Sequence, residues 1–405
     1  MKGKWMYVIL ATFFAVFFLY SCTSPTTTNS KEVVITIDRD GINRNATLIL
    51  AQDGLNGEWK ELTGTNGIYK FNVNNPDGVY SVAAVDDSDS EIQLFHSTLA
   101  EEKTVNIAFP PDYDTDFATL TVYVPTDYAS AKMSIAFLNY SPLLSFSLND
   151  ASATVKIPKG RGDLVIIIRN QDSETLSKIY VKRNFDFLSS QSITIAKNDL
   201  KDPAQQITGG TQLVFYNWIL GKTIVPFFLN QNTAIPETVM NSEDKYVASY
   251  LNGDLIKSYI SWSKVTKDVP VTIKNGINEL SPSTTTISAT AVENNLPKIT
   301  FVPYKSPISE YKTRYYSFAI SKKVGDLYFT YTTQTHSILI TPGYLSKVGN
   351  IYKFPNITLT VWKDEYKPVD DYFVQSLDIC LSPNTIDEIN SLKIGTEVLG
   401  LYSKF

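Results

Sequence analysis

Short runs in which apolar and polar residues alternate, separated by Gly, Asn, Asp and Pro, occupy most of the chain. This period of two is typical of β-strands that bury one face. One stretch near the end has helical signals, with Asn384 as a possible N-cap for residues 385–392. We therefore expect an all-β fold. In its N-terminal part the pattern predicts strands over residues 33–37, 46–50, 68–73, 79–85 and 104–108.

The order of these strands recurs along the chain. A turn rich in Gly or Asp leads into a strongly apolar strand, and a closing strand follows. Tyr80 precedes Ile107 by 27 residues, and Val165 precedes Ile195 by 30. Several short strands at such spacing predict tandem β-sandwiches, divided where turn residues cluster. The predicted sandwiches cover residues 32–110, 117–198, 211–278 and 284–405, the last with a C-terminal tail.

Aromatic and proline residues follow a regular placement in the last unit, at residues 315–320, 328–331, 341–345 and 350–354. In this it resembles a fibronectin type III domain. The first two units are similar to the generic immunoglobulin-like or transthyretin-like sandwiches of bacterial surface proteins. These resemblances imply non-catalytic sandwiches, because neither brings catalytic residues with it.

The first residues have the layout of a secretory signal. Lys2 and Lys4 precede a run of 15 apolar or nearly apolar residues, from Met6 to Tyr20. A helix needs about 20 such residues to span the hydrocarbon core of a bilayer. The run therefore suits the hydrophobic part of a signal peptide over residues 1–21.

Leu19-Tyr20-Ser21-Cys22 resembles the bacterial lipobox, although Tyr20 is bulkier than usual. The resemblance implies a thioether-linked lipid on Cys22, cleavage before it and palmitate-type acylation of the new N-terminus. Several acyl chains give durable membrane attachment. Residues 22–31 would then be a tether, and Thr23 resembles residues that allow transfer to an outer membrane. In a host without one, the anchor would lie on the outer face of the cytoplasmic membrane. An ordinary signal peptide or an uncleaved anchor is the alternative.

The charge composition limits the classes of partner that the protein is expected to bind. The 36 Lys and Arg stand against 41 Asp and Glu, and cleavage after residue 21 leaves 34 against 41, a net charge of −7. An acidic chain without basic clusters argues against nucleic acid as a partner.

If Cys22 carries lipid, Cys380 has no partner for a disulfide, and its apolar neighbours predict a buried, inert thiol. Two histidines, His96 and His336, lie too far apart in the sequence to suggest a histidine-based site.

Acidic residues cluster in three places. Asp112, Asp114 and Asp116 alternate between the first two units, and residues 86–91 and 364–371 hold two further groups. Carboxylates at this spacing could bind Ca²⁺ and stiffen a joint, and Ca²⁺ is the one cofactor we consider. The alternative is a solvated polar linker. An EF-hand is excluded, because Phe117 stands where its glycine would be needed.

Two other motifs have a functional and a structural interpretation. Arg161-Gly162-Asp163 spells the tripeptide that animal integrins recognise, but its glycine also suits the tip of a hairpin. Trp59 and Trp362 have polar neighbours and could stack on a sugar, whereas Trp218 has the surroundings of a core residue. Tryptophan is also an ordinary core residue of β-sandwiches.

No Gly-x-Ser-x-Gly elbow, phosphate loop or His-Glu-x-x-His motif occurs in the chain. We therefore expect no enzyme activity. The first hypothesis is a lipid-anchored structural and interaction scaffold of the cell envelope. The second is a lipoprotein that binds a carbohydrate or peptide as an accessory to uptake or degradation. A hydrolase that uses paired carboxylates is a third, less favoured hypothesis.

Overall fold

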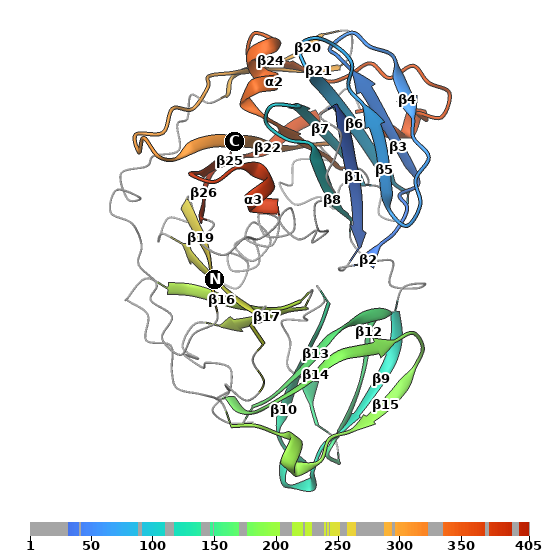
Figure 1. The fold of residues 1–405 in the computed structure, drawn as a ribbon, viewed down its shortest axis with the longest axis vertical. Helices are drawn as coiled ribbons and strands as arrows, with labels where there is room; N and C mark the ends of the chain where they lie inside the picture. Colours follow the sequence, from blue (N-terminus) through green and yellow to red (C-terminus); the bar gives the residue numbers. More distant parts are fainter. Residues whose placement is uncertain are drawn as a thin grey trace.

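Strands dominate the computed structural model, which the reader can follow in Figure 1. Within its described residues, no helix is long and apolar enough to cross a membrane. The expected all-β class is confirmed. The structure describes residues 31–39, 42–87, 91–109, 117–138, 146–148, 150–169, 176–202, 213–221, 223–228, 239, 241–242, 244–251, 257–264, 287–293, 296–322, 335–368, 372–390 and 397–404.

The N-terminal strands form a two-layered sandwich. One layer has the order β5-β1-β8, with the short β2 beside the end of β1, and the other has the order β4-β3-β6-β7. A core that includes Ile35, Tyr80 and Phe95 fills the space between the layers. The strands are β1 (Glu32–Arg39), β2 (Ile42–Asn43), β3 (Leu48–Asp53), β4 (Trp59–Glu61), β5 (Ile68–Asn72), β6 (Val79–Asp86), β7 (Glu91–Thr98) and β8 (Thr104–Phe109).

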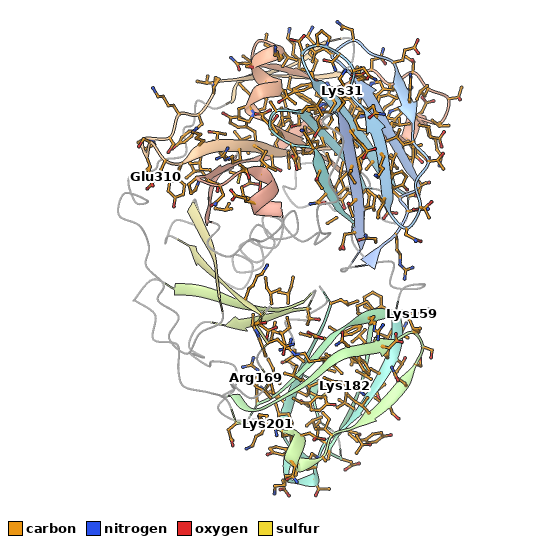
Figure 2. The ribbon with its side chains drawn as sticks, viewed as in Figure 1. Lys31, Lys159, Arg169, Lys182, Lys201 and Glu310 are labelled. Carbon is orange, nitrogen blue, oxygen red and sulfur yellow. The ribbon has the colours of Figure 1, made fainter. Side chains whose placement is uncertain are left out.

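A second sandwich follows, at the bottom of Figure 1. Its two sheets have the orders β11-β10-β13-β14 and β12-β9-β15, and its core includes Leu120, Phe137 and Ile166. Figure 2 shows the side chains that fill the layers of both sandwiches. The elements are β9 (Phe117–Tyr123), η1 (Thr126–Tyr128), β10 (Lys132–Phe137), β11 (Phe146–Ser147), β12 (Ser152–Pro158), β13 (Gly160–Arg169), β14 (Leu176–Phe187), β15 (Gln191–Thr194) and η2 (Lys197–Asp199).

Most of the later strands extend the four-stranded sheet β4-β3-β6-β7 of the first sandwich. The extended sheet has twelve strands among the described residues, in the order β17-β16-β18-β19-β26-β25-β22-β23-β7-β6-β3-β4. The later elements are β16 (Leu213–Leu220), β17 (Thr223–Phe228), β18 (Lys245–Leu251), β19 (Lys257–Lys264), β20 (Ile287–Glu293), β21 (Leu296–Phe301), β22 (Lys312–Lys322), β23 (Thr335–Ile340), α2 (Pro342–Lys347), β24 (Ile351–Lys353), η5 (Asp364–Tyr366), β25 (Tyr372–Ser382), α3 (Ile386–Asn390) and β26 (Glu397–Lys404).

The junction of this sheet is the parallel pair formed by β7 and β23. All residues of β6 are buried, because its first face packs in the sandwich core and its second face packs under the C-terminal elements. The small sheet β20-β21-β24 and helix α2 supply Phe301, Tyr352 and Leu345 to that second core. A strand that is buried on both faces has a nearly continuous apolar sequence, which explains the run from Val79 to Val85, in which Ser81 is the one polar residue.

Strand β13 is also covered on both faces. Leu164, Ile166 and Ile168 point into the core of the second sandwich, whereas Val165 and Ile167 belong to the cluster that contains Trp218 of β16 and Val225 of β17. Strands β16 and β17 therefore pack against the outer face of the second sandwich.

The helix expected near the end is present as α3. Thr385 and Glu388 form a reciprocal cap, in which the Glu388 N–H donates to Thr385 Oγ1 and the Thr385 N–H donates to Glu388 Oε2. The cap is thus Thr385, one residue after the expected Asn384. The boundaries of the four tandem units stay a prediction, and the pairing of β7 with β23 joins the first of those units to the fourth.

Candidate functional site

The residues expected to carry lipid and calcium lie outside the described part of the chain. This holds for Cys22, Asp112, Asp114 and Asp116. Lipidation and calcium binding there therefore stay predictions. Among the described residues, no group of three or more His, Cys, Asp or Glu side chains lies close enough to hold a metal ion.

Both tryptophans that were considered for ligand binding lie in the core. Trp59 is 8% exposed and Trp362 is 4% exposed, and both belong to the large cluster beneath the C-terminal elements. Trp362 packs edge-on against Tyr366, with ring centroids 5.4 Å apart. Of the two interpretations, the core position therefore holds for both rings. Ligand binding by either ring stays a prediction, and it would require the ring to be uncovered.

Two of the three acidic loops come together around a lysine. Lys363 Nζ lies 3.2 Å from Asp87 Oδ2 and 3.1 Å from Glu365 Oε1, and Tyr366 donates to Asp87 Oδ1 at 2.6 Å. Hydrogen bonds to Tyr366, Glu365 and Asp87 raise the pKa of Lys363. Asp87 and Glu365 thus share Lys363 as a counter-ion, and the contacts of Asp87 tie the first sandwich to residues 363–366.

Glu101 makes a second contact between the first sandwich and the C-terminal elements. Its carboxylate accepts hydrogen bonds from the Gly343 N–H at 2.7 Å, Thr341 Oγ1 at 2.5 Å and Thr98 Oγ1 at 2.9 Å. It therefore caps the start of α2 from another part of the chain. A Cβ on Gly343 would lie 2.3 Å from Glu101 Oε2, so a larger residue at this position would displace the carboxylate from its present place.

Both histidines of the chain lie on the joining pair of strands, His96 in β7 and His336 in β23. His96 Nδ1 is 2.8 Å from Ser81 Oγ, and its ring lies 4.9 Å from that of Tyr344 in α2. His336 Nε2 is 2.9 Å from the Tyr366 carbonyl oxygen. Burial lowers the pKa of His96 to about 3 and that of His336 to about 4. Both rings are therefore neutral packing groups at pH 7.

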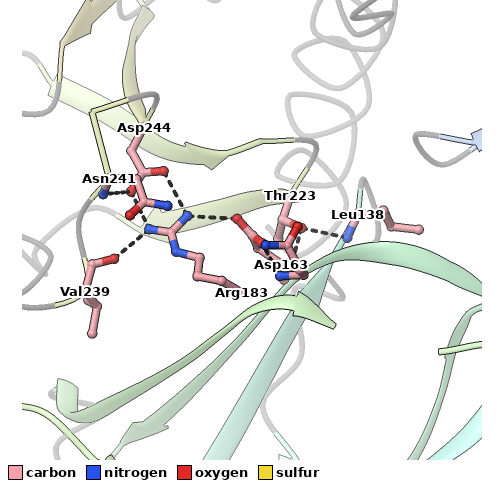
Figure 3. A network of polar contacts seen from close by, with 8 residues as sticks. Leu138, Asp163, Arg183, Thr223, Val239, Asn241 and Asp244 are labelled. Atoms are coloured by element: carbon pink, nitrogen blue, oxygen red, sulfur yellow. Dashed lines mark hydrogen bonds and ion pairs between the residues drawn. The ribbon is translucent and has the colours of Figure 1, made fainter. Parts of the chain in front are cut away.

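A third polar cluster joins the second sandwich to the next strands (Figure 3). Arg183 of β14 binds both carboxylate oxygens of Asp244, at 2.9 and 2.5 Å, and binds Asp163 Oδ2 at 2.8 Å. Asp244 is 1% exposed and Arg183 is 21% exposed. Burial alone would lower the pKa of Arg183, but the hydrogen bonds to Asp244 and Asp163 raise it overall. A paired fork of this kind fixes orientation as well as charge.

Backbone contacts beside Arg183 strengthen this junction. Thr223 at the start of β17 donates to the Asp163 carbonyl oxygen and accepts the Leu138 N–H at 3.0 Å. The Ile224 N–H donates to the Leu138 carbonyl oxygen at 3.0 Å. Leu138 has a φ of 55°, a conformation rarely adopted by a branched side chain. The junction thus holds a strained residue in place.

These contacts also place the Arg-Gly-Asp tripeptide. It lies within β13, paired with β14, where a hairpin tip was expected. A Cβ on Gly162 would lie 2.6 Å from Leu138 Cδ2, and Asp163 accepts from Arg183 and from the Asn184 N–H. The glycine and the aspartate therefore have structural partners at a strand irregularity.

Cys380 is buried, as expected, and burial raises its pKa to about 12. Its thiol is therefore in the unreactive protonated form. On the same strand, burial raises the pKa of Asp378 to about 7.

Sequence patterns gave no sign of Glu101 or Arg183 as joining residues. Thr341 lies 240 positions from Glu101, and Asp244 lies 61 positions from Arg183, so no local spacing connects them. For Asp163 the one available signal was its position after Gly162, and that signal favoured a turn.

Comparison with known proteins gives no family. No protein-family model matches the chain, and no curated protein matches it. Similar solved structures include the Bacillus anthracis TIE protein, with 10% identity over 59% of this chain and 49% of that one, and a TM-score of 0.17. GBS52, the minor pilin of Streptococcus agalactiae, shares 12% identity over 44% of this chain and all of its own, with a TM-score of 0.19.

A DUF3823 family protein from Parabacteroides merdae shares 6% identity over 72% of this chain and all of its own, with a TM-score of 0.15. The chain spans about half the length of the TIE protein. Likenesses at these TM-scores carry no argument about function, which we therefore base on the geometry.

Proposed function

We propose that this protein is a non-catalytic, lipid-anchored component of the cell envelope, which serves as a structural and interaction scaffold. One observation carries the proposal: segments far apart in the sequence are fastened to one another by buried polar contacts. Glu101 caps α2, and Arg183 is held between Asp163 and Asp244. A body with such fixed joints keeps the segments that they connect in a constant arrangement.

The described groups that could do chemistry support the same proposal. Both histidines are buried and neutral, Cys380 is buried and protonated, and Asp87 is engaged by Lys363 and Tyr366. These side chains therefore contribute to packing and to joints. Cys22 would fasten the body to the membrane, with residues 22–31 as the tether.

Labelling and fractionation test the anchor. Cells that express the full chain would be fed an alkyne fatty acid, and label and membrane association would be compared between wild type and Cys22→Ala. We expect label and membrane association in the wild type, and their loss in the variant, because acyl chains supply the membrane affinity. Cys380→Ala is the matched control and should keep both. Wild-type protein that lacks label, or an unlabelled variant that stays membrane-bound, would contradict the anchor.

Cross-linking tests the scaffold role. In intact cells, a cross-linker should join the wild-type protein to defined envelope components, and fewer of these adducts should form with Cys22→Ala. Turnover of a polysaccharide or peptide by the purified protein would instead show an enzyme.

A further inference from the structure

One sheet of the second sandwich presents a nearly uncharged outer face, at the right of that sandwich in Figure 1. Along β9, residues 118, 120 and 122 are buried, whereas Thr119, Thr121 and Tyr123 are half-buried or exposed on the other side. The strand register places residues of β12 and β15 beside them. We call the following eight residues the hydroxyl face: Thr119, Thr121, Tyr123, Ser152, Thr154, Lys156, Ser192 and Thr194.

The rows of this face follow from the register. Ser152 and Thr194 flank Tyr123, and Thr154 and Ser192 flank Thr121. Thr121 Oγ1 and Thr154 Oγ1 are 3.1 Å apart, which is hydrogen-bonding distance across the strands. Strands lie about 4.8 Å apart, so three of them present a strip roughly 10 Å wide. The face is therefore narrow and lined with hydroxyl groups.

The charge of this face differs from that of the whole chain. It carries no carboxylate and one ammonium group, on Lys156 at its end, whereas the chain has a net charge of −5. Each hydroxyl can both donate and accept a hydrogen bond. Such a surface complements a ligand that is itself uncharged and rich in hydroxyl groups, whereas the acidic chain as a whole repels a polyanion.

Tyr123 adds an aromatic surface to the face. Tyr123 is 46% exposed. Among the described residues, the other large hydrophobic side chains that are exposed are all aliphatic. An exposed tyrosine offers an apolar ring with a polar hydroxyl group, which suits ligands that have both apolar and hydrated polar surfaces. The apolar C–H side of a sugar ring fits against it while neighbouring Thr and Ser hydroxyls reach the sugar hydroxyls.

We propose that the hydroxyl face binds an uncharged polysaccharide, with Tyr123 packed against one sugar ring. This gives a specific site to the carbohydrate-binding hypothesis, at a residue that its sequence interpretation did not include. The proposal depends on neither the lipid on Cys22 nor the joints around Glu101 and Arg183. Its failure is therefore distinguishable from failure of the anchor, which is measured by labelling.

Binding of the full chain, purified in detergent, tests this site. The probes are insoluble cellulose and chitin in pull-down, and dextran and mannan in affinity electrophoresis, with alginate as the acidic probe. We expect saturable binding to at least one neutral polysaccharide. Tyr123→Ala should weaken it by about tenfold or more, as for an aromatic residue central to an interface. Tyr123→Phe should stay within about threefold, because the ring is kept.

A second variant keeps the test independent of Tyr123. Thr121→Val with Thr154→Val keeps the shape of the face and removes two hydroxyls, so it should weaken binding severalfold. Ile68→Ala, which changes an exposed apolar residue of the first sandwich, is the control and should bind as the wild type. Circular dichroism confirms that each variant is folded.

Four results would overturn the proposal. The first is that the wild-type protein binds none of the neutral polysaccharides. The second is stronger binding to alginate, which would assign an acidic ligand. The third is unchanged binding in the folded Tyr123→Ala protein and in the double threonine variant. If instead the wild type self-associates in sedimentation and Tyr123→Ala does not, the face is a contact between copies and the proposal fails.

Discussion

At the scale of single residues, a few buried charges decide which segments meet. Arg183 contacts Asp163 in β13, and it contacts Asp244 and the carbonyl oxygen of Val239 in the segment before β18, so its partners come from two separate stretches of the chain. Removing one partner of a buried ion pair leaves the other charge without compensation in a low-dielectric site. The contribution of Arg183 therefore lies more in preventing that penalty than in net attraction.

We predict that Arg183→Ala lowers the free energy of unfolding by about 2–3 kcal/mol, somewhat below the cost for a fully buried pair, because Arg183 is partly exposed. Urea unfolding followed by tryptophan fluorescence measures the change. Arg183→Lys should recover part of it, since the charge is kept and the fork is lost. The control is Lys70→Ala, which breaks the exposed ion pair with Glu32 and should cost less than about 1 kcal/mol. Equal costs for the two alanine variants would contradict the role assigned to Arg183.

At the scale of elements, the parallel pair of β7 and β23 is the feature that most changes the tandem picture. It places Ile92 opposite His336 and His96 opposite Ile340, so one histidine lies towards each end of the pair. Tyr344, Tyr352 and Ser81 surround the ring of His96, and Phe354 packs edge-on against His336. Protonation of either ring would place a charge in this apolar junction.

We predict that stability falls as the pH drops from about 6.5 towards 4. An unfolded histidine binds a proton near pH 6.5, whereas burial lowers the pKa of His96 to about 3 and that of His336 to about 4 in the folded protein. Within this window the unfolded state binds more protons at both histidines, and the loss approaches about 1.4 kcal/mol per pH unit for each. Asp378, whose pKa burial raises to about 7, binds its proton more readily in the folded state and offsets about one of these two contributions, so the net loss corresponds to about one histidine.

Urea unfolding at pH 7, 6, 5 and 4.5 measures this slope. His96→Phe should reduce the slope even if it lowers stability at pH 7. Ser81→Ala removes the hydrogen bond to His96 but not the titrating group, so it should keep the wild-type slope. A slope unchanged by His96→Phe would show that other groups cause the acid sensitivity.

At the scale of the whole molecule, the first sandwich and the C-terminal elements share a core. Val85, Ile92 and Leu94 on one face of the N-terminal sheet belong to the same cluster as Phe301 and Tyr352. Without those elements this face and the edge of β7 would be exposed to water. A large exposed apolar face together with an open strand edge favours aggregation.

We therefore predict that a fragment of residues 31–109 is unstable alone. It should bind a hydrophobic dye and aggregate in size-exclusion chromatography, because burial of that face contributes roughly 25 cal/mol per Å². A fragment of residues 117–202 is the matched control. It loses the cover of β16 and β17 but exposes fewer residues of the large cluster, so it should give more native-like circular dichroism. A monomeric, cooperatively unfolding 31–109 fragment would instead support independent tandem units.

The sequence by itself determined the features that depend on neighbouring residues. Period-two alternation indicated the all-β class, apolar neighbours indicated the burial of Cys380, and helical signals indicated α3. Such patterns act within a few residues, and so they are visible in the order of the letters. The apolar runs in β6 and β13 also carried information, because such runs are typical of strands covered on both faces.

Only the tertiary structure decided which surfaces those strands would meet. Polar neighbours suggested exposure for Trp59 and Trp362, but segments distant in the sequence cover both rings. Glu101 and Gly343 approach each other across most of the chain, and the register of β9 with β12 and β15 assembles the hydroxyl face. Long-range contacts of this kind leave no local spacing to detect, because they depend on how whole sheets pack, which is settled when the chain folds.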